Sequence, residues 1–328
     1  MAHKIGEFDR QEGIKQAWHG LTHVKESINV WDNWLTQWEV SKKPMFNPDG
    51  SPSEWTRVTC SDNNLYIGKP VHQDTYSLIT NEQFLDIVND ALLSVKGAKI
   101  DSVGSVCDRG RVFVSVSIPD LPEFRAAGRE FRAYLNFINS HDQSSPFAVN
   151  ASNVCVVCDN TFRYNLHDKN NKVFRAVVKH TKNANDKLHD IDRMIEAYVG
   201  TQVRFKYLMD TLDQAPVTGT TAGNFFTGLH SPVVAKPSTQ LINKVDELQS
   251  LFRSGRGNRG QTLADVFSAV TDYYTHQSSR SENPWRQIES SEYGFGATMK
   301  ARTMEILTDP QEYADTVMRG KEVMAMAN

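Results

Sequence analysis

The sequence predicts an α+β fold, in which an antiparallel sheet is backed by a long amphipathic helix and followed by a mostly helical C-terminal part. Two observations carry this prediction. Residues 112–118 and 131–137 repeat their apolar side chains with period two, as half-buried antiparallel strands do. Residues 185–212 instead repeat them at helical spacing, which predicts one long amphipathic helix that packs on the sheet.

Length and composition are those of a globular chain. The 328 residues, 39% of them hydrophobic, are enough for one large core or two. The formal net charge of -3 excludes a uniformly basic surface but allows a local basic groove. No window approaches the roughly 18 apolar residues that cross a bilayer, and the polar first ten residues contain no signal core. We therefore expect a cytoplasmic protein that has no membrane partner, and the four cysteines are too few for a disulfide scaffold.

The elements before the middle strands follow from local patterns. Residues 55–72 predict two strands joined at Ser61–Asn64, because Asp and Asn favour turns. A helix should follow, with Thr80 or Asn81 as its cap. Its predicted buried face comprises Phe84, Ile87, Val88, Ala91 and Leu92.

Two further strands are expected at 147–158 and 172–181. Between them a short helix-like segment would be capped by Asn160 or Thr161. Thr, Gly and Pro are frequent in 213–239, which lacks either periodicity and is expected to be a loop or hinge. The predicted organisation is an α+β core domain at 1–212 that includes an N-terminal extension, the hinge at 213–239, and a helical region at 240–328. The helices of that region are expected at 241–252, 262–276 and 297–307.

Two motifs imitate cofactor sites without matching them. Cys155 and Cys158 have C-x-x-C spacing, but residues three apart on a strand point to opposite faces and cannot chelate one metal. The segment Gly255–Thr262 has the glycine spacing of a phosphate-binding loop, but Gln261 replaces its lysine and a helix precedes it. We expect no cofactor. The arginines of the segment either touch a phosphate backbone or belong to a mobile solvated turn.

A polar motif at Ser140–Ser144 has two interpretations. His141 and Asp142 would orient one another in an acid–base site, with Asp159 or His180 nearby if the strand ends converge. Turn chemistry explains the same residues, because Asp142 forms turns through its side chain, and Asn160 and Thr161 are natural caps. No established catalytic pattern supports a particular reaction, so the chain is expected not to be an enzyme.

Basic residues concentrate between Arg163 and Lys206. Positive charge interleaved with aromatic rings holds single-stranded nucleic acid, because the charges follow phosphates and the rings stack on bases. A solvated face of a sheet or helix is the alternative. The candidate nucleic-acid-binding residues are Arg132, Tyr134, Lys172, Arg175, Lys179, His180 and Lys182.

A collinear series of motifs along nearly the whole chain resembles a phage- and plasmid-encoded family that carries a domain of unknown function. Three residues depart from the family pattern: Gln143 replaces a usual glycine, Val156 an arginine, and Asp159 an asparagine or alanine. The lost arginine puts an anion contact at that position in doubt. The series comprises Trp18–Leu21, Trp38–Val40 with Pro44, Gly104–Ser105, Gly110–Val114, Ser140–Asp142, Val154–Thr161, Lys179–Thr181, Thr262, Ala269–Thr271 and His276.

That family is distantly similar to single-strand annealing proteins of the Rad-fifty-two and Erf type, whose sheet is backed by a long helix and which assemble into rings. The resemblance implies a homo-oligomer that binds single-stranded DNA and anneals it during phage recombination or replication in the host cytoplasm, without nucleotide or metal. Two alternatives stay open: a phage protein that acts on a host factor, and an uncharacterised enzyme that uses the region of His141 and Asp142.

Overall fold

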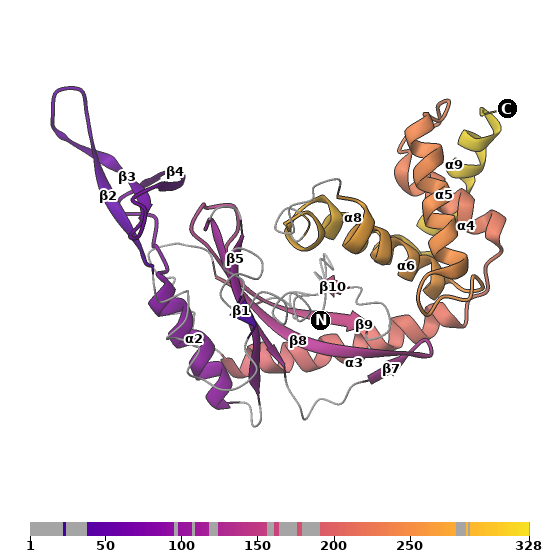
Figure 1. Cartoon of the computed structure of the whole chain (residues 1–328), viewed down its shortest axis with the longest axis horizontal. Helices are drawn as coiled ribbons and strands as arrows, with labels where there is room; N and C mark the ends of the chain where they lie inside the picture. The colour runs from indigo at the N-terminus through magenta and orange to yellow at the C-terminus, as the bar shows by residue number, and fades with distance from the viewer. Residues whose placement is uncertain are drawn as a thin grey trace.

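The strands come first in the chain and the helices last (Figure 1). This arrangement, seen in a computed structural model, confirms an α+β fold with a helical C-terminal part. In Figure 1 a small sheet projects at one end of the molecule, the helices near the C-terminus occupy the other end, and a larger sheet lies between them. The structure describes residues 22–23, 38–94, 98–106, 109–117, 124–155, 161–163, 176–178, 191–279, 287 and 289–327.

The larger sheet is antiparallel and has the order β1-β5-β6-β8-β9-β10, with β7 paired to β8 and β11 paired to β9. It contains the expected strands, and β9 and β11 fall within the stretches expected after them. The expected helix at Asn160 or Thr161 is wrong, because Thr161 begins a short strand that pairs with β9. The bounds are β1 Thr22–His23, β5 Lys99–Val106, β6 Arg111–Ser117, β7 Phe124–Ala126, β8 Arg129–Ser140, β9 Phe147–Cys155, β10 Thr161–Arg163 and β11 Ala176–Val178.

β8 is the central strand, and it is not half-buried as its alternation predicts. Leu135 and Phe137 enter one hydrophobic core, but Tyr134, Asn136 and Ile138 on the opposite face are buried as well. Period two identifies the strand and its two faces. It does not report whether the second face is also covered, which depends on tertiary packing.

The smaller sheet consists of β2 (Val40–Phe46), β3 (Pro52–Cys60) and β4 (Tyr66–His72), in that order. Helix α2 follows at Asn81–Ser94, as its cap and apolar spacing predict. Its Phe84 packs edge-to-face on Phe147 of β9, with ring centroids 6.1 Å apart. One apolar cluster therefore joins the inner face of the smaller sheet, α2 and the larger sheet.

A second apolar cluster joins the start of β8 to the helices. The long helix α3 contacts β7, β9 and β11, and its Phe205 lies edge-to-face on Phe131 with ring centroids 5.3 Å apart. The cluster thus extends across the expected hinge at 213–239. The prediction of a loop is wrong for Gly219–His230. These residues form helix α4, whose N-cap is Thr218. The helices are α3 Ile191–Asp213, α4 Gly219–His230, α5 Thr239–Ser254, α6 Leu263–Asp272, η6 Tyr273–Gln277, η7 Glu289–Tyr293, α8 Phe295–Thr308 and α9 Pro310–Ala325.

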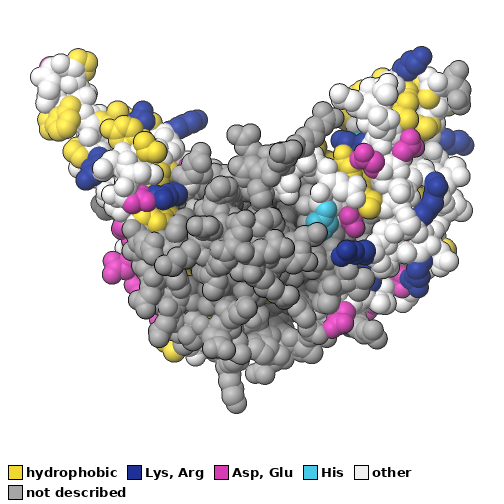
Figure 2. Space-filling view, in the orientation of Figure 1, with side chains coloured by type: hydrophobic (Ala, Val, Ile, Leu, Met, Phe, Trp, Pro, Cys, Tyr) yellow, Lys and Arg dark blue, Asp and Glu magenta, His cyan; other side chains and the backbone are white. Residues whose placement is uncertain are grey.

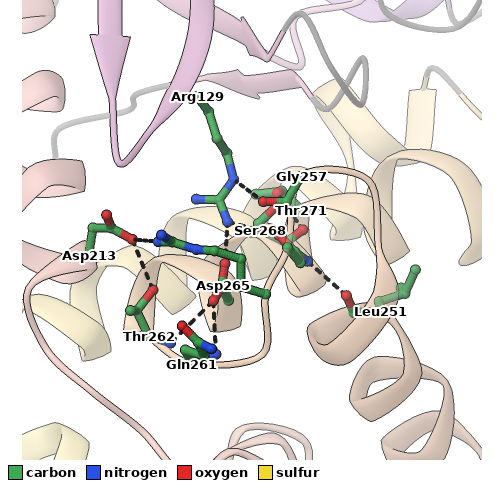
Figure 3. A network of polar contacts seen from close by, with 11 residues as sticks. Arg129, Asp213, Leu251, Gly257, Gln261, Thr262, Asp265, Ser268 and Thr271 are labelled. Carbon is green, nitrogen blue, oxygen red and sulfur yellow. Dashed lines mark hydrogen bonds and ion pairs between the residues drawn. The ribbon is translucent and has the colours of Figure 1, made fainter.

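A buried ion pair ties the sheet to the helical part (Figure 3). The Arg129 guanidinium, at the start of β8, pairs with Asp265 on α6, and both side chains are almost fully buried. The same guanidinium donates to the carbonyl of Gly257 (3.2 Å) and to the side chain of Asn258 (3.0 Å). Asp265 also accepts the backbone N–H of Gln261 at 2.9 Å. One arginine therefore connects β8 with both the α5–α6 loop and α6.

We expect Arg129→Ala to destabilise the protein by about 3–5 kcal/mol, because the change leaves the Asp265 carboxylate buried without its cation. Urea unfolding measures this loss. The double variant Arg129→Met/Asp265→Leu should recover most of it, since an apolar pair removes both buried charges.

The matched control is Lys206→Ala, which breaks an exposed i,i+4 pair with Asp210. Its expected cost is under about 1 kcal/mol, because water screens such pairs. Equal losses in the Arg129 and Lys206 variants would contradict the role given to Arg129.

His230, the last residue of α4, joins that helix to η6. Its Nδ1–H donates to the Phe226 carbonyl at 2.7 Å, so its Nε2 accepts from the Tyr274 hydroxyl at 2.8 Å. Burial, opposed by the Phe226 carbonyl and assisted by Lys244, lowers the pKa of His230 from 6.5 to about 4. The folded protein therefore holds this imidazole neutral.

Because the pKa of His230 is lower in the folded than in the unfolded chain, its contribution to stability is complete above pH 6.5. It is lost as the pH falls from 6.5 toward 4, with a total loss of about 3 kcal/mol. Urea unfolding at several pH values measures this slope. His230→Gln should flatten it over that window, and an unchanged slope would contradict the assignment.

Candidate nucleic-acid interface

The polar motif at Ser140–Ser144 forms a tight turn after β8. One oxygen of Asp142 accepts the Ser140 hydroxyl at 2.8 Å, the backbone N–H of Ser144 at 2.9 Å and also the Ser144 hydroxyl. Gln143 has φ +60°, in the left-handed region that favours glycine. One carboxylate oxygen of Asp142 is thus engaged inside the turn.

His141 is fully buried behind this turn. Its Nδ1 lies 3.2 Å from the Arg109 carbonyl, to which it donates, and its Nε2 accepts the side-chain N–H of Asn139 at 3.3 Å. The ring also lies edge-to-face against Trp38, with centroids 5.9 Å apart. Both nitrogens are engaged away from solvent, so the acid–base interpretation has no route to a substrate at this residue.

The turn also holds the smaller sheet in place. A Cβ atom on Gly68 of β4 would lie 2.7 Å from the Cα of Asp142, so only glycine allows this approach. Arg109 stacks over the Trp38 ring at 5.0 Å and binds Asp62 in the β3–β4 turn. Its guanidinium holds the pKa of Asp62 below the usual range. The motif therefore anchors the β2–β4 sheet to the larger one.

The glycine-arginine segment Gly255–Thr262 is not a solvated turn throughout. Its carbonyl at Gly257 and its Asn258 side chain both bind Arg129 (Figure 3). Arg259 pairs with Asp213 at 2.6 Å, while the guanidinium stays about half exposed. The segment is therefore the loop between α5 and α6, and its contacts with Arg129 and Asp213 hold it against β8 and α3.

The outer face of the smaller sheet carries a group of aromatic and basic side chains that we call the aromatic-basic face. The strand register places them together, because Lys43 pairs with Arg57, Thr59 with Tyr66, and Trp55 with His72, and directly paired residues share a face. Its members are Lys43, Trp55, Arg57, Tyr66 and His72.

The rings of this face are paired with polar or charged neighbours and open to solvent. Arg57 lies over the Tyr66 ring at 4.8 Å, and Trp55 meets His72 edge-to-face with centroids 5.8 Å apart. The exposed fractions are 63% for Tyr66 and 48% for Trp55. Figure 2 shows hydrophobic and basic side chains mixed on this projecting part.

The charge of this face is available to an external anion. Within the described part of the chain, Lys43 and Arg57 make no ion pair. By contrast Lys42, which pairs with the buried Val58, directs its ammonium to the carbonyls of Gln73 (2.8 Å) and Tyr76. The two neighbouring lysines therefore lie on opposite faces of β2. Lys42 has a structural role, and Lys43 is exposed.

Sequence reasoning predicted the strands at 55–72 but missed this face. The signal was present in Trp55-Thr56-Arg57-Val58-Thr59-Cys60, where apolar and small residues alternate with an aromatic and a cation. Val58 and Cys60 face the core, so Trp55 and Arg57 must face outward.

The predicted nucleic-acid-binding residues lie mostly beyond the described ranges. Lys172, Arg175, Lys179, His180 and Lys182 lie outside them, as do Asn160 of the predicted turn motif and Asp159 of the catalytic alternative. Arg132 is on β8 and Thr161 on β10, but their side chains are not among those described. Tyr134 is 8% exposed and offers no open ring face for stacking.

The described residues also bear on metal sites and membrane spans. No group of three or more potential metal ligands occurs among them. Within the same ranges, no helix has the length and apolar character of a membrane span. Cys60 is a free, buried thiol, and burial raises its pKa.

Comparison with known families gives one match. The model of a family described as a domain of unknown function (DUF932) matches residues 70–305. The chain belongs to the DUF932 family. The DUF932 match begins within β4 and ends within α8, so it includes the turn at His141 and Asp142 and the Arg129–Asp265 pair. β2 and β3 precede it, so among the members of the aromatic-basic face only His72 lies inside it. No curated protein and no solved structure matches the chain.

We expect Asp142→Ala to destabilise the protein by about 1–3 kcal/mol, because three donors lose their shared acceptor and one of them is the hydroxyl of the buried Ser140. Urea unfolding measures the change. Asp49→Ala is the matched control, since Asp49 also accepts from a following serine but in the fully exposed β2–β3 turn. We expect little change there, and a similar loss in both variants would contradict the anchoring role of Asp142.

Proposed function

We propose that the protein binds single-stranded DNA on the aromatic-basic face and anneals complementary strands, as a homo-oligomer of phage recombination or replication. The observation that carries the proposal is the pairing of exposed rings with cations on one open sheet face, above all Arg57 over Tyr66. Single-strand binding needs this combination, because rings stack on bases while cations neutralise phosphates. Neither role requires a nucleotide or a metal.

The spacing of the two rings fits an extended strand. Trp55 lies four residues before Thr59, the partner of Tyr66, so the two rungs are roughly 13 Å apart at about 3.3 Å per residue. Bases of one strand that are splayed apart can reach both rings. A duplex keeps its bases stacked on one another, so its bases are not available to rings on a sheet surface.

The annealing part of the proposal draws on the fold. An antiparallel sheet contacted by a long helix is the arrangement that the resemblance to annealing proteins implies. The smaller sheet projects beside the larger one (Figure 1), and the Trp55 and Tyr66 side chains on it are exposed. An assembly of several such faces would hold two strands close enough to pair.

The burial of His141 favours this function over the enzyme alternative. A catalytic base must reach its substrate within hydrogen-bond distance, directly or through one water. His141 has no exposed surface, and a backbone carbonyl and an amide hold its two nitrogens.

We expect Trp55→Ala/Tyr66→Ala to weaken binding of a fluorescent single-stranded oligonucleotide by about thirtyfold or more, because each stacked base contributes about 1–3 kcal/mol. Fluorescence anisotropy at low salt measures the Kd, and mass photometry of the same sample reports the oligomer. Tyr207→Ala is the matched control, since that tyrosine is 68% exposed on α3 and distant in sequence.

A salt titration tests the basic residues of the face separately. Lys43→Gln should reduce the slope of log K against log salt by about 0.7, the value for one phosphate contact on a single strand. Lys321→Gln, which removes an exposed lysine of α9, should leave the slope unchanged. No binding of the oligonucleotide at low salt would overturn the proposed function and direct attention to a protein partner. Binding of the Trp55→Ala/Tyr66→Ala variant with the wild-type Kd would overturn the assignment of DNA binding to this face.

A further inference from the structure

The helical part contains a cavity that neither the DUF932 match nor the proposed function explains. It has a volume of about 460 Å³ and lies where the end of α4, the first half of α5 and η6 meet. This size is within the roughly 300–1,000 Å³ of sites for small molecules. Residues from 230 to 278 form it, so it shares no residue with the aromatic-basic face.

Lys244 gives this cavity its charge. Its ammonium lies 6.0 Å from the centroid of the Tyr273 ring, which also lines the cavity. Burial lowers the pKa of Lys244, and the charge of Glu247 on the next turn opposes this effect. Among the described residues Lys244 makes no ion pair. A partly buried cation with no paired anion favours the binding of an anion.

The remaining lining residues supply hydrogen bonds, and the exposed Glu247 adds one negative charge. His230 is held neutral by burial, and both its nitrogens are engaged by Phe226 and Tyr274. Gln240 and Asn243 present amide groups on the exposed side of α5. The cavity reaches the first turn of this helix, whose positive dipole end adds to the attraction that Lys244 exerts on an anion.

We propose that this cavity binds a small oxyanion-bearing metabolite, whose phosphate or carboxylate group pairs with Lys244. The amides of Gln240 and Asn243 donate to its oxygens, and Glu247 accepts a hydrogen bond from a hydroxyl group of the ligand. The Tyr273 ring forms an apolar wall against the carbon skeleton. This arrangement of one cation, two amides, one carboxylate and one ring suits a hydroxylated acid or sugar phosphate.

Calorimetric titration of the full chain at low ionic strength tests the proposal with inorganic phosphate and acetate as separate probes, each compared with sodium chloride at equal ionic strength. We expect saturable binding of at least one probe, with a millimolar Kd and a rise in Tm. The probe that binds more tightly distinguishes a phosphate from a carboxylate ligand.

Lys244→Gln should weaken binding of that probe at least fivefold, while Lys321→Gln should bind like the wild type. Gln240→Glu provides a second variant in case Lys244→Gln is poorly folded. It places a negative charge at an exposed position of the first turn of α5, where acidic residues are well tolerated, and should also weaken binding.

Two results would overturn the proposal. One is the absence of saturable binding of both probes to folded wild-type protein, and the other is equal binding by the wild type and the folded Lys244 or Gln240 variants. Loss of DNA binding by Trp55→Ala/Tyr66→Ala leaves this test unaffected, because the two sites have no residue in common.

Discussion

The buried pair between Arg129 and Asp265 is the interaction on which the association of sheet and helices depends. A guanidinium taken out of water needs an anion nearby, and Arg129 finds Asp265 on α6 and two further acceptors in the α5–α6 loop. This requirement fixes where α6 lies relative to the start of β8. Asp210 of α3 adds a second link at the same end, because it accepts the backbone N–H of Ala127 in the β7–β8 turn at 2.9 Å.

Two groups of polar residues among those described differ in burial. Those of the turn at His141 and Asp142 bind one another and the backbone, so they stabilise the junction between the two sheets. Those of the aromatic-basic face are open and contact mainly rings. The motif with the more catalytic composition is therefore a structural support, and the face that it holds in place has the chemistry of a binding surface.

Local patterns predicted most elements because caps and apolar spacing act on residues that are close in sequence. The cap Thr80 and the spacing from Phe84 to Leu92 placed α2, and period two placed β6 and β8. Helix α4 was missed because its sequence, GTTAGNFFTGLH, is rich in residues of low helix propensity. Its burial against α9 and α5 stabilises it instead, and no local pattern reports such packing. The short strand β10 likewise exists through its pairing with β9.

The sequence by itself determined the fold class, the alternation of the strands and the turn chemistry of the Ser140–Ser144 motif, because these depend on neighbours within a few residues. Only the tertiary structure decided that His141 is buried, that Arg129 meets Asp265 across 136 positions, and that Arg57 lies over Tyr66. Burial and register depend on contacts between distant segments. The same side chain is catalytic, structural or binding according to which distant residues cover it, and spacing along the chain does not contain that information.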